Sequence, residues 1–145
     1  MATIKAYTDL EQSRELAKFL SHDSADMFYS DIFTDEKHKY NFHYLETYGF
    51  KTFEDTKLKE SKHLSFIPCW GQSALYNILP VVIGNILEKN ALRLRLDKGE
   101  TDFAVWYENI DTHYVEDGLD VVESNPVDAY FQMICKLHER GLLSK

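Results

Sequence analysis

The chain has 145 residues and a mass of 17.0 kDa, which suits one domain with its own hydrophobic core. Apolar residues make up 44% of the sequence, and nine Phe, nine Tyr and two Trp exclude an intrinsically disordered chain. The 16 Lys and Arg against 24 Asp and Glu give a net charge of −8, which disfavours sequence-general binding to nucleic acid.

Cysteine usage and hydropathy indicate the compartment. The two cysteines, Cys69 and Cys135, are too few for a disulfide framework and form no CxxC pair. The first residues lack the apolar run of a secretion signal, and the longest apolar stretch, residues 78–83, is too short to span a bilayer. We therefore expect a cytoplasmic protein that has no membrane contact and no cofactor.

A capping-box pattern marks the first expected helix. Thr8 and Glu11 are spaced so that each side chain can satisfy a free backbone N–H at a helix start. The pattern predicts a helix of about twelve residues after Thr8. Residues 4–7, which precede it, are expected to form a short strand.

Three further strands are expected before residue 70. Residues 27–29 are an apolar and aromatic run, and residues 42–50 place aromatic side chains at alternate positions, although a helix there stays an alternative. Residues 64–67 are expected to form the third strand and Pro68 to end it. The polar residues 51–62 indicate a solvated connector.

The second half carries the clearest strand pattern. Residues 70–79 predict a short helix that Pro80 closes. Residues 92–96 then alternate leucine with arginine, residues 97–100 indicate a turn, and residues 103–107 return as the second strand of a hairpin. Residues 114–115 and 119–122 are expected to add edge pairing.

The last twenty residues predict a helix with both of its ends marked. Asn125 can cap free N–H groups, Pro126 suits the first turn, and Gly141 tolerates the left-handed conformation that ends many helices. Apolar residues recur between them at helical spacing and predict a buried stripe, namely Val127, Tyr130, Phe131, Ile134 and Leu137.

These elements together predict the α+β class. We expect a single domain over residues 1–145, in which a mainly antiparallel sheet is covered on one face by the N-terminal and C-terminal helices.

Several short pieces of the sequence resemble a known group of proteins. The wording and order of these pieces are similar to a family of small uncharacterised proteins from gut bacteria and their phages or mobile elements, and the pieces are residues 6–13, 24–27, 67–70, 104–107, 125–129 and 136–139. The resemblance spans most of the chain and implies a cytosolic protein of phage or mobile-element origin. The family brings no known activity with it.

Two groups of residues are candidates for a ligand site. Cys69 and Trp70 follow Pro68 where a helix is expected to begin, and the positive end of a helix can lower a thiol pKa and produce a nucleophile. Burial of the thiol is the alternative, because cysteine is often buried.

The second group lies on the predicted hairpin. Arg93 and Arg95 share one strand face, and the partner strand can place Asp102, Trp106 and Glu108 opposite them. Guanidinium groups beside an aromatic ring can hold an anionic or planar ligand. An exposed face with cross-strand ion pairs is the alternative.

No metal site is expected. Cys135 and His138 are three residues apart on the last helix but lack two further zinc ligands. His22, Asp23 and Asp26 are expected to turn the chain after the first helix.

These observations favour a non-catalytic protein-interaction module that engages an unknown protein partner through an acidic and aromatic surface. The sequence contains no assembled acid, base and nucleophile set, and its many tyrosines suit an interface. The alternative is a small anionic-ligand binder or enzyme with its site near Cys69 and Trp70, or near Arg93, Arg95 and Trp106.

Overall fold

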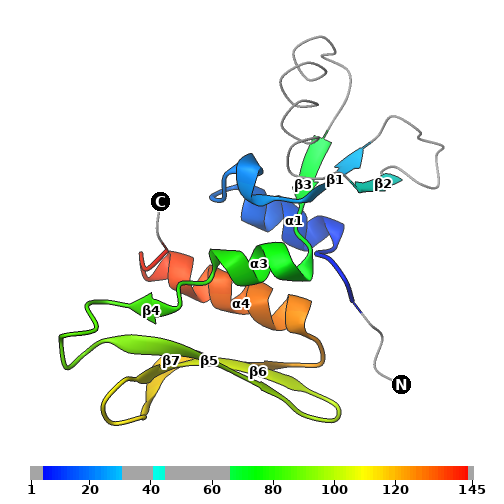
Figure 1. Cartoon of the computed structure of the whole chain (residues 1–145). Coiled ribbons are helices and arrows are strands. Elements are labelled where there is room, and N and C mark those ends of the chain that lie inside the picture. Colours follow the sequence, from blue (N-terminus) through cyan, green and yellow to red (C-terminus); the bar gives the residue numbers. More distant parts are fainter. Residues whose placement is uncertain (1–4, 31–40, 45–65, 144–145) are drawn as a thin grey trace. The chain divides into compact units, whose positions relative to one another are not determined.

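The computed structural model describes residues 5–30, 41–44 and 66–143 (Figure 1). The chain divides into two compact units: residues 7–74 form one, and residues 1–6 with 75–145 form the other. We call them the N-terminal unit and the C-terminal unit. The strands predicted over residues 45–50 and 64–65 and the connector over residues 51–62 lie outside the described residues.

In its described residues, the N-terminal unit combines a helix, a 3-10 turn and a small antiparallel sheet. Its elements are α1 (Leu10–Ala17), η1 (His22–Ser24), β1 (Met27–Ser30), β2 (Asn41–Tyr44) and β3 (Phe66–Cys69). The strand order is β2-β1-β3, and α1 packs against β3. The strands predicted over residues 27–29 and 42–44 are therefore confirmed.

The start of α1 differs from the predicted capping box by one residue. Asp9 caps the helix: its carboxylate accepts from the Gln12 backbone N–H at 2.8 Å, and the Gln12 side chain accepts from the Asp9 backbone N–H at 3.1 Å. Thr8 is instead fully buried. A threonine hydroxyl can satisfy either a helix end or a buried neighbour, and here tertiary contacts take it.

Pro68 lies inside β3, so the prediction that it ends the strand was wrong. It is paired with Phe28 of β1. The strand order places β3 at an edge of the three-stranded sheet, with a hydrogen-bonded neighbour on one side only. Proline is tolerated in such a strand, because its missing N–H can lie on the side that has no partner.

The C-terminal unit is built on a four-stranded antiparallel sheet. Its strands are β4 (Val82–Ile83), β5 (Leu92–Lys98), β6 (Phe103–Asn109) and β7 (Val115–Glu123), in the order β4-β5-β6-β7. The predicted hairpin is confirmed, with Arg95 opposite Trp106 and Arg93 opposite Glu108. β7 supplies the edge pairing predicted over residues 115 and 119–122, while Tyr114 lies just outside the strand. The register between β6 and β7 is irregular between Trp106 and Glu108.

The last helix, α4 (Pro126–Glu139), has the predicted ends. Asn125 accepts from the Asp128 backbone N–H at 2.9 Å, and Pro126 stands in the first turn. At the other end Gly141 has a φ of 68°. Its N–H donates to the His138 carbonyl, and the Leu142 N–H donates to the Leu137 carbonyl, as in a Schellman motif.

The apolar stripe of α4 is buried against β6 and β7, and it differs from the predicted stripe at one position. Val127, Tyr130, Ile134 and Leu137 are buried as predicted, whereas Phe131 is half-buried and Met133 is fully buried. The Tyr130 ring meets the Phe103 ring edge to face, with 5.6 Å between the centroids. Figure 1 shows α4 lying along one face of the sheet. That face is the core of the unit.

The predicted helix over residues 70–79 is α3 (Gln72–Ile78), which turns Leu75 and Leu79 into buried positions. After it, the Tyr107 hydroxyl donates to the Pro80 carbonyl at 2.7 Å, and burial raises the pKa of that hydroxyl. Tyr107 therefore joins the segment that follows α3 to the centre of the sheet.

Basic side chains of α4 contact the backbone of the edge strand β7. The Lys136 Nζ atom donates to the carbonyls of Gly118 at 3.3 Å and Asp120 at 3.4 Å. The Arg140 guanidinium donates to the Asp117 carbonyl at 2.5 Å. These contacts tie the last turn of α4 and the residue after it to the backbone of β7.

The α+β class, antiparallel pairing and terminal helices are confirmed. The arrangement differs from the expected single sheet, because α1 packs on β3 of one sheet and α4 on β6 and β7 of the other. The single domain over residues 1–145 stays a prediction.

We expect Ile134→Ala to lower the free energy of unfolding by about 2–5 kcal/mol, because it leaves a cavity between α4 and the sheet. Glu139→Ala, on the exposed side of the same helix, should change it by less than about 0.5 kcal/mol. Urea denaturation measures both, and equal effects would contradict the packing described.

Candidate functional site

The structure places Cys69 and Trp70 inside the N-terminal unit, where both are fully buried. Thr8 connects them: its backbone N–H donates to the Trp70 carbonyl at 3.0 Å, and its hydroxyl accepts from the Trp70 backbone N–H at 3.1 Å. The Cys69 thiol donates to the Thr8 carbonyl at 3.4 Å, and the Trp70 indole N–H donates to Ser24 at 2.9 Å. These contacts are those of a packed interior.

The pKa of the Cys69 thiol is raised, whereas a nucleophilic cysteine needs a lowered pKa. Burial raises the pKa of the thiol to about 11, although hydrogen bonds from Thr8, Ser13 and Tyr29 act in the other direction. The helix that follows, α3, starts three residues later at Gln72. The thiol is therefore neutral at neutral pH and enclosed, which does not favour attack on a substrate.

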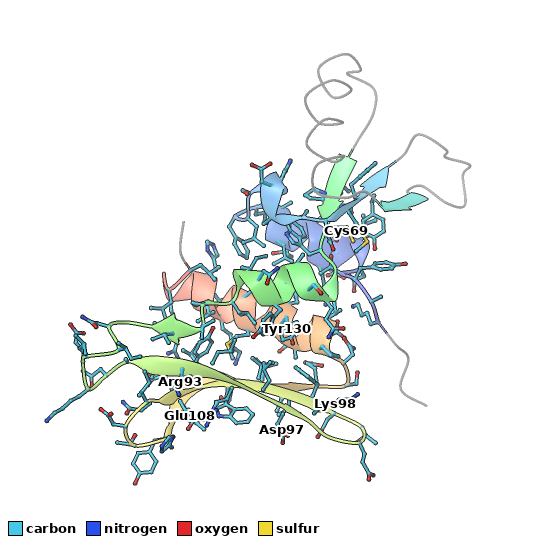
Figure 2. The ribbon with its side chains drawn as sticks, viewed as in Figure 1. Cys69, Arg93, Asp97, Lys98, Glu108 and Tyr130 are labelled. Carbon is cyan, nitrogen blue, oxygen red and sulfur yellow. The ribbon has the colours of Figure 1, made fainter. Side chains whose placement is uncertain are left out.

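The hairpin group lies on the sheet face that points away from α4. Along β6, the side chains of Phe103, Val105 and Tyr107 are buried toward the helix. Strand alternation then turns Trp106 and Glu108 to the opposite side. Arg93 and Arg95 join them from β5 through the cross-strand register. We call this side the outer face, and Figure 2 shows Asp97 and Glu108 on the side of the sheet away from α4.

The Glu108 carboxylate is the centre of the outer face. Only 8% of this residue is exposed. Its Oε1 accepts from Arg95 Nε at 2.5 Å, and its Oε2 lies 3.1 Å from His113 Nδ1. The hydrogen bond from Arg95 holds the pKa of Glu108 below its usual value, with His113 adding to the effect and burial opposing it. Both carboxylate oxygens are therefore engaged.

His113 reaches Glu108 from a tight turn after β6. Its backbone φ is 61°, and it is the one residue other than glycine with positive φ in the described part of the chain. Asn109 organises this turn, because its side-chain oxygen accepts from the N–H groups of Asp111 at 2.8 Å and Thr112 at 3.0 Å. Histidine tolerates this conformation better than most residues.

Arg93 is placed differently from Arg95. It faces Glu108 across the strand pair, but the carboxylate is taken by Arg95 and His113. Among the residues that the structure describes, Arg93 makes no ion pair, and its side chain is exposed. Asp102, which was expected on this face, lies in the hairpin turn, where its carbonyl accepts from the Gly99 N–H.

The outer face also has an apolar and an acidic part. Trp106 is half-buried beside Asp120 of β7, and the neighbouring Val122 is 62% exposed. Val115, the first residue of β7, is paired with Glu108 and is 50% exposed. Exposed carboxylates accompany them on β5 and β7, namely Asp97 and Asp120.

Sequence reasoning identified the arginines, Trp106 and Glu108 but missed His113 as a partner of Glu108. The sequence Asn109 to His113 does contain a signal, because asparagine followed by aspartate and threonine is typical of a turn held by side-chain oxygens. Such a turn would bring residue 113 back toward residue 108.

No three His, Cys, Asp or Glu side chains in the described ranges are grouped as a metal site would require. Asp26, from the cluster weighed in the sequence, accepts from the Gly71 N–H at 2.7 Å. No described helix combines the length and apolarity needed to cross a bilayer. Comparison of the chain with protein-family models, curated proteins and solved structures finds no match.

The lowered pKa of Glu108 predicts a pH-dependent stability. The stabilisation is present above the unfolded-state pKa, about 4.3 for glutamate, and is lost as the pH falls through the lower folded-state pKa. Glu108→Gln should therefore lower the melting temperature at pH 7, and the gap to the wild type should close below about pH 4. Glu100→Gln, in the exposed hairpin turn, is the control and should melt like the wild type at pH 7. A gap that stays constant with pH would contradict this account.

Proposed function

We propose that this protein is a non-catalytic interaction module that binds a basic surface of another protein through the outer face of the β5–β7 sheet. The observation that carries the proposal is the character of that face. Trp106 and the exposed Val115 and Val122 lie on it beside carboxylates, while α4 packs on the other side.

The apolar part of the face supports a protein partner. Tryptophan and tyrosine supply much of the binding energy in protein interfaces, because each covers a large area with few rotatable bonds. Trp106 lies opposite Arg95 of β5 and Asp120 of β7. Val122, two residues from Asp120 on the same strand face, extends the apolar area.

The charges of the face favour a basic partner. Arg95 is neutralised by Glu108, which leaves Arg93 against the exposed Asp97 of β5 and Asp120 of β7. The net charge of −8 adds a long-range attraction toward cationic surfaces. A partner rich in Lys and Arg would therefore be attracted to the carboxylates of this face.

The chemistry of the candidate residues supports a role without catalysis. Cys69 is enclosed and protonated, and the Glu108 carboxylate has both oxygens engaged. A cytoplasmic location and a phage or mobile-element origin belong to the same proposal and depend on the sequence alone.

The test compares two double variants, each of which replaces one carboxylate by lysine and one aliphatic side chain by serine. Asp120→Lys with Val122→Ser alters the outer face, and Glu100→Lys with Leu87→Ser alters exposed positions in two loops of the same unit. A partner captured from the native host by the wild type is purified, and its affinity for each protein is measured by calorimetry. We expect the outer-face variant to bind at least about tenfold more weakly, which corresponds to about 1.4 kcal/mol.

The control variant should bind like the wild type, and the affinity should fall as salt is added. The proposal would be overturned by a partner that binds the outer-face variant unchanged, by equal losses in both variants, or by capture of no specific protein.

Arg93 supports a second candidate function, the binding of a small anion. Its guanidinium is exposed and unpaired within the described ranges, and it lies one cross-strand row from Trp106, which can stack on a planar group. The alternative site at Cys69 and Trp70 gains no such support, because both side chains are buried.

Arg93→Gln tests anion binding more sharply than loss of both arginines, because loss of Arg95 would also remove a partner of Glu108. Phosphate, pyrophosphate and nucleotides are screened by thermal shift on the wild type, on Arg93→Gln and on the control Lys98→Gln. An anion site predicts a saturable rise in melting temperature that only Arg93→Gln loses, worth about 2.7 kcal/mol at a hundred times the dissociation constant. A flat screen would exclude this second function for the anions tried.

A further inference from the structure

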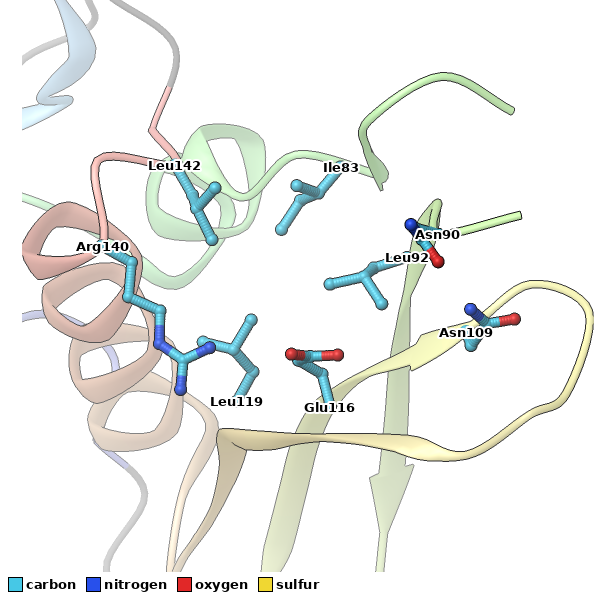
Figure 3. Close-up of a pocket in the computed structure, with 8 residues that line it drawn as sticks. All are labelled: Ile83, Asn90, Leu92, Asn109, Glu116, Leu119, Arg140 and Leu142. Carbon is cyan, nitrogen blue, oxygen red and sulfur yellow. The ribbon is translucent and has the colours of Figure 1, made fainter. Parts of the chain in front are cut away.

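A pocket of about 440 Å³ lies in the C-terminal unit, on the inner side of the sheet (Figure 3). It is formed where the end of α4 meets β4, β5 and β7, away from the outer face. Its lining combines four aliphatic side chains with two amides and two opposite charges, namely Ile83, Leu92, Leu119, Leu142, Asn90, Asn109, Glu116 and Arg140. The volume falls within the range of small-molecule sites.

The two charges lie on opposite elements and face the same space. Arg140 comes from the end of α4 and Glu116 from β7, and Figure 3 shows both head groups directed into the pocket. No ion pair joins them in the described structure. Arg140 uses one amino group on the Asp117 carbonyl, and a guanidinium has five N–H donors, so donors are left for a ligand.

The position of Arg140 is fixed by the fold. Gly141 and Leu142 close α4 with two backbone hydrogen bonds, which fixes the direction in which residue 140 leaves the helix. Gly118 of β7, with a φ of 80°, leaves the space that the guanidinium fills, because a Cβ atom there would clash with Arg140. The irregular register of β7 supplies Glu116 in the same region.

The remaining lining is apolar at the base and polar at one wall. Leu92 and Leu119 are buried, and Leu142 and Ile83 are half-buried above them. The Asn109 side chain is used in its own turn and bonds the Lys89 carbonyl at 2.8 Å. Asn90 has no hydrogen bond through its side chain among the described residues, so its amide can serve a ligand.

We propose that this pocket binds a small zwitterion with an aliphatic body, either an apolar α-amino acid or a short peptide with free ends. The ligand carboxylate pairs with Arg140, the ammonium pairs with Glu116, and the aliphatic side chain covers Leu92 and Leu142. Arg140 and Glu116 carry opposite charges above an aliphatic base, and a zwitterion can pair with both of them. A ligand with a single charge would leave either Arg140 or Glu116 without a partner. The proposal does not depend on the outer face.

The experiment titrates the full-length protein with leucine and with the dipeptide Leu-Leu, followed by amide NMR shifts and calorimetry. Leucinamide, which lacks the carboxylate, and N-acetyl-leucine, which lacks the ammonium, are the matched probes. We expect saturable binding of leucine or Leu-Leu, with shifts concentrated at residues 116–119 and 140–142. Each matched probe should bind about tenfold more weakly. Leucine and Leu-Leu distinguish a free amino acid from a peptide end.

Variants assign each charge. Glu116→Gln should bind leucine and N-acetyl-leucine equally, and Arg140→Gln should bind leucine and leucinamide equally, while Arg140→Lys restores part of the preference for the carboxylate. Glu100→Gln and Lys98→Gln, which remove the same charges from the hairpin end, should behave like the wild type. The proposal is overturned if neither leucine nor Leu-Leu binds, if the shifts lie elsewhere, or if the preferences survive Glu116→Gln and Arg140→Gln in proteins whose NMR spectra show a folded chain.

Discussion

The burial of the α4 stripe against β6 and β7 determines which way every side chain of the four-stranded sheet points. Strand side chains alternate, so fixing Val105 and Tyr107 beneath the helix also fixes Trp106 and Glu108 on the other side. A slip of one residue would exchange the two sets and turn the Glu108 carboxylate toward α4. Both candidate sites depend on this one packing contact: the outer face is its reverse side, and the pocket is the end of the helix where it meets β7.

The two units show contrasting uses of buried polar groups. In the N-terminal unit, Thr8, Ser13 and the Cys69 thiol satisfy one another away from water, with 2.8 Å between the two hydroxyl oxygens. Such a network specifies how α1, β3 and the preceding segment fit together, since each group would be costly if left unpaired. In the C-terminal unit, the near-buried Glu108 is paired at the surface, where its partners Arg95 and His113 stay in contact with water. The first arrangement stabilises the interior of the N-terminal unit, and the second places the charged partners of Glu108 at the protein surface.

Local patterns predicted the elements whose determinants lie close together in the sequence. The leucine and arginine alternation fixed the β5–β6 register, and Asn125 with Gly141 fixed the ends of α4. Long-range contacts decided the rest. Asp9 caps α1 in place of Thr8, because the Thr8 hydroxyl is hydrogen-bonded to Ser13 and to the Trp70 backbone N–H. Pro68 is accommodated within β3 because this strand lies at an edge of its sheet. The pocket could not be predicted, because Glu116, Arg140 and Leu92 meet only once β7 has bent and α4 has docked.

Lys136 and Arg140 bind the backbone of β7 through their positively charged side chains. Each long cation donates to backbone carbonyls of β7, which is an edge strand of the four-stranded sheet. Acetylation of Lys136 would remove its charge and weaken its two contacts with β7, while the Arg140 contact would remain. The docking of the last helix is therefore open to chemical modification at one of these two positions.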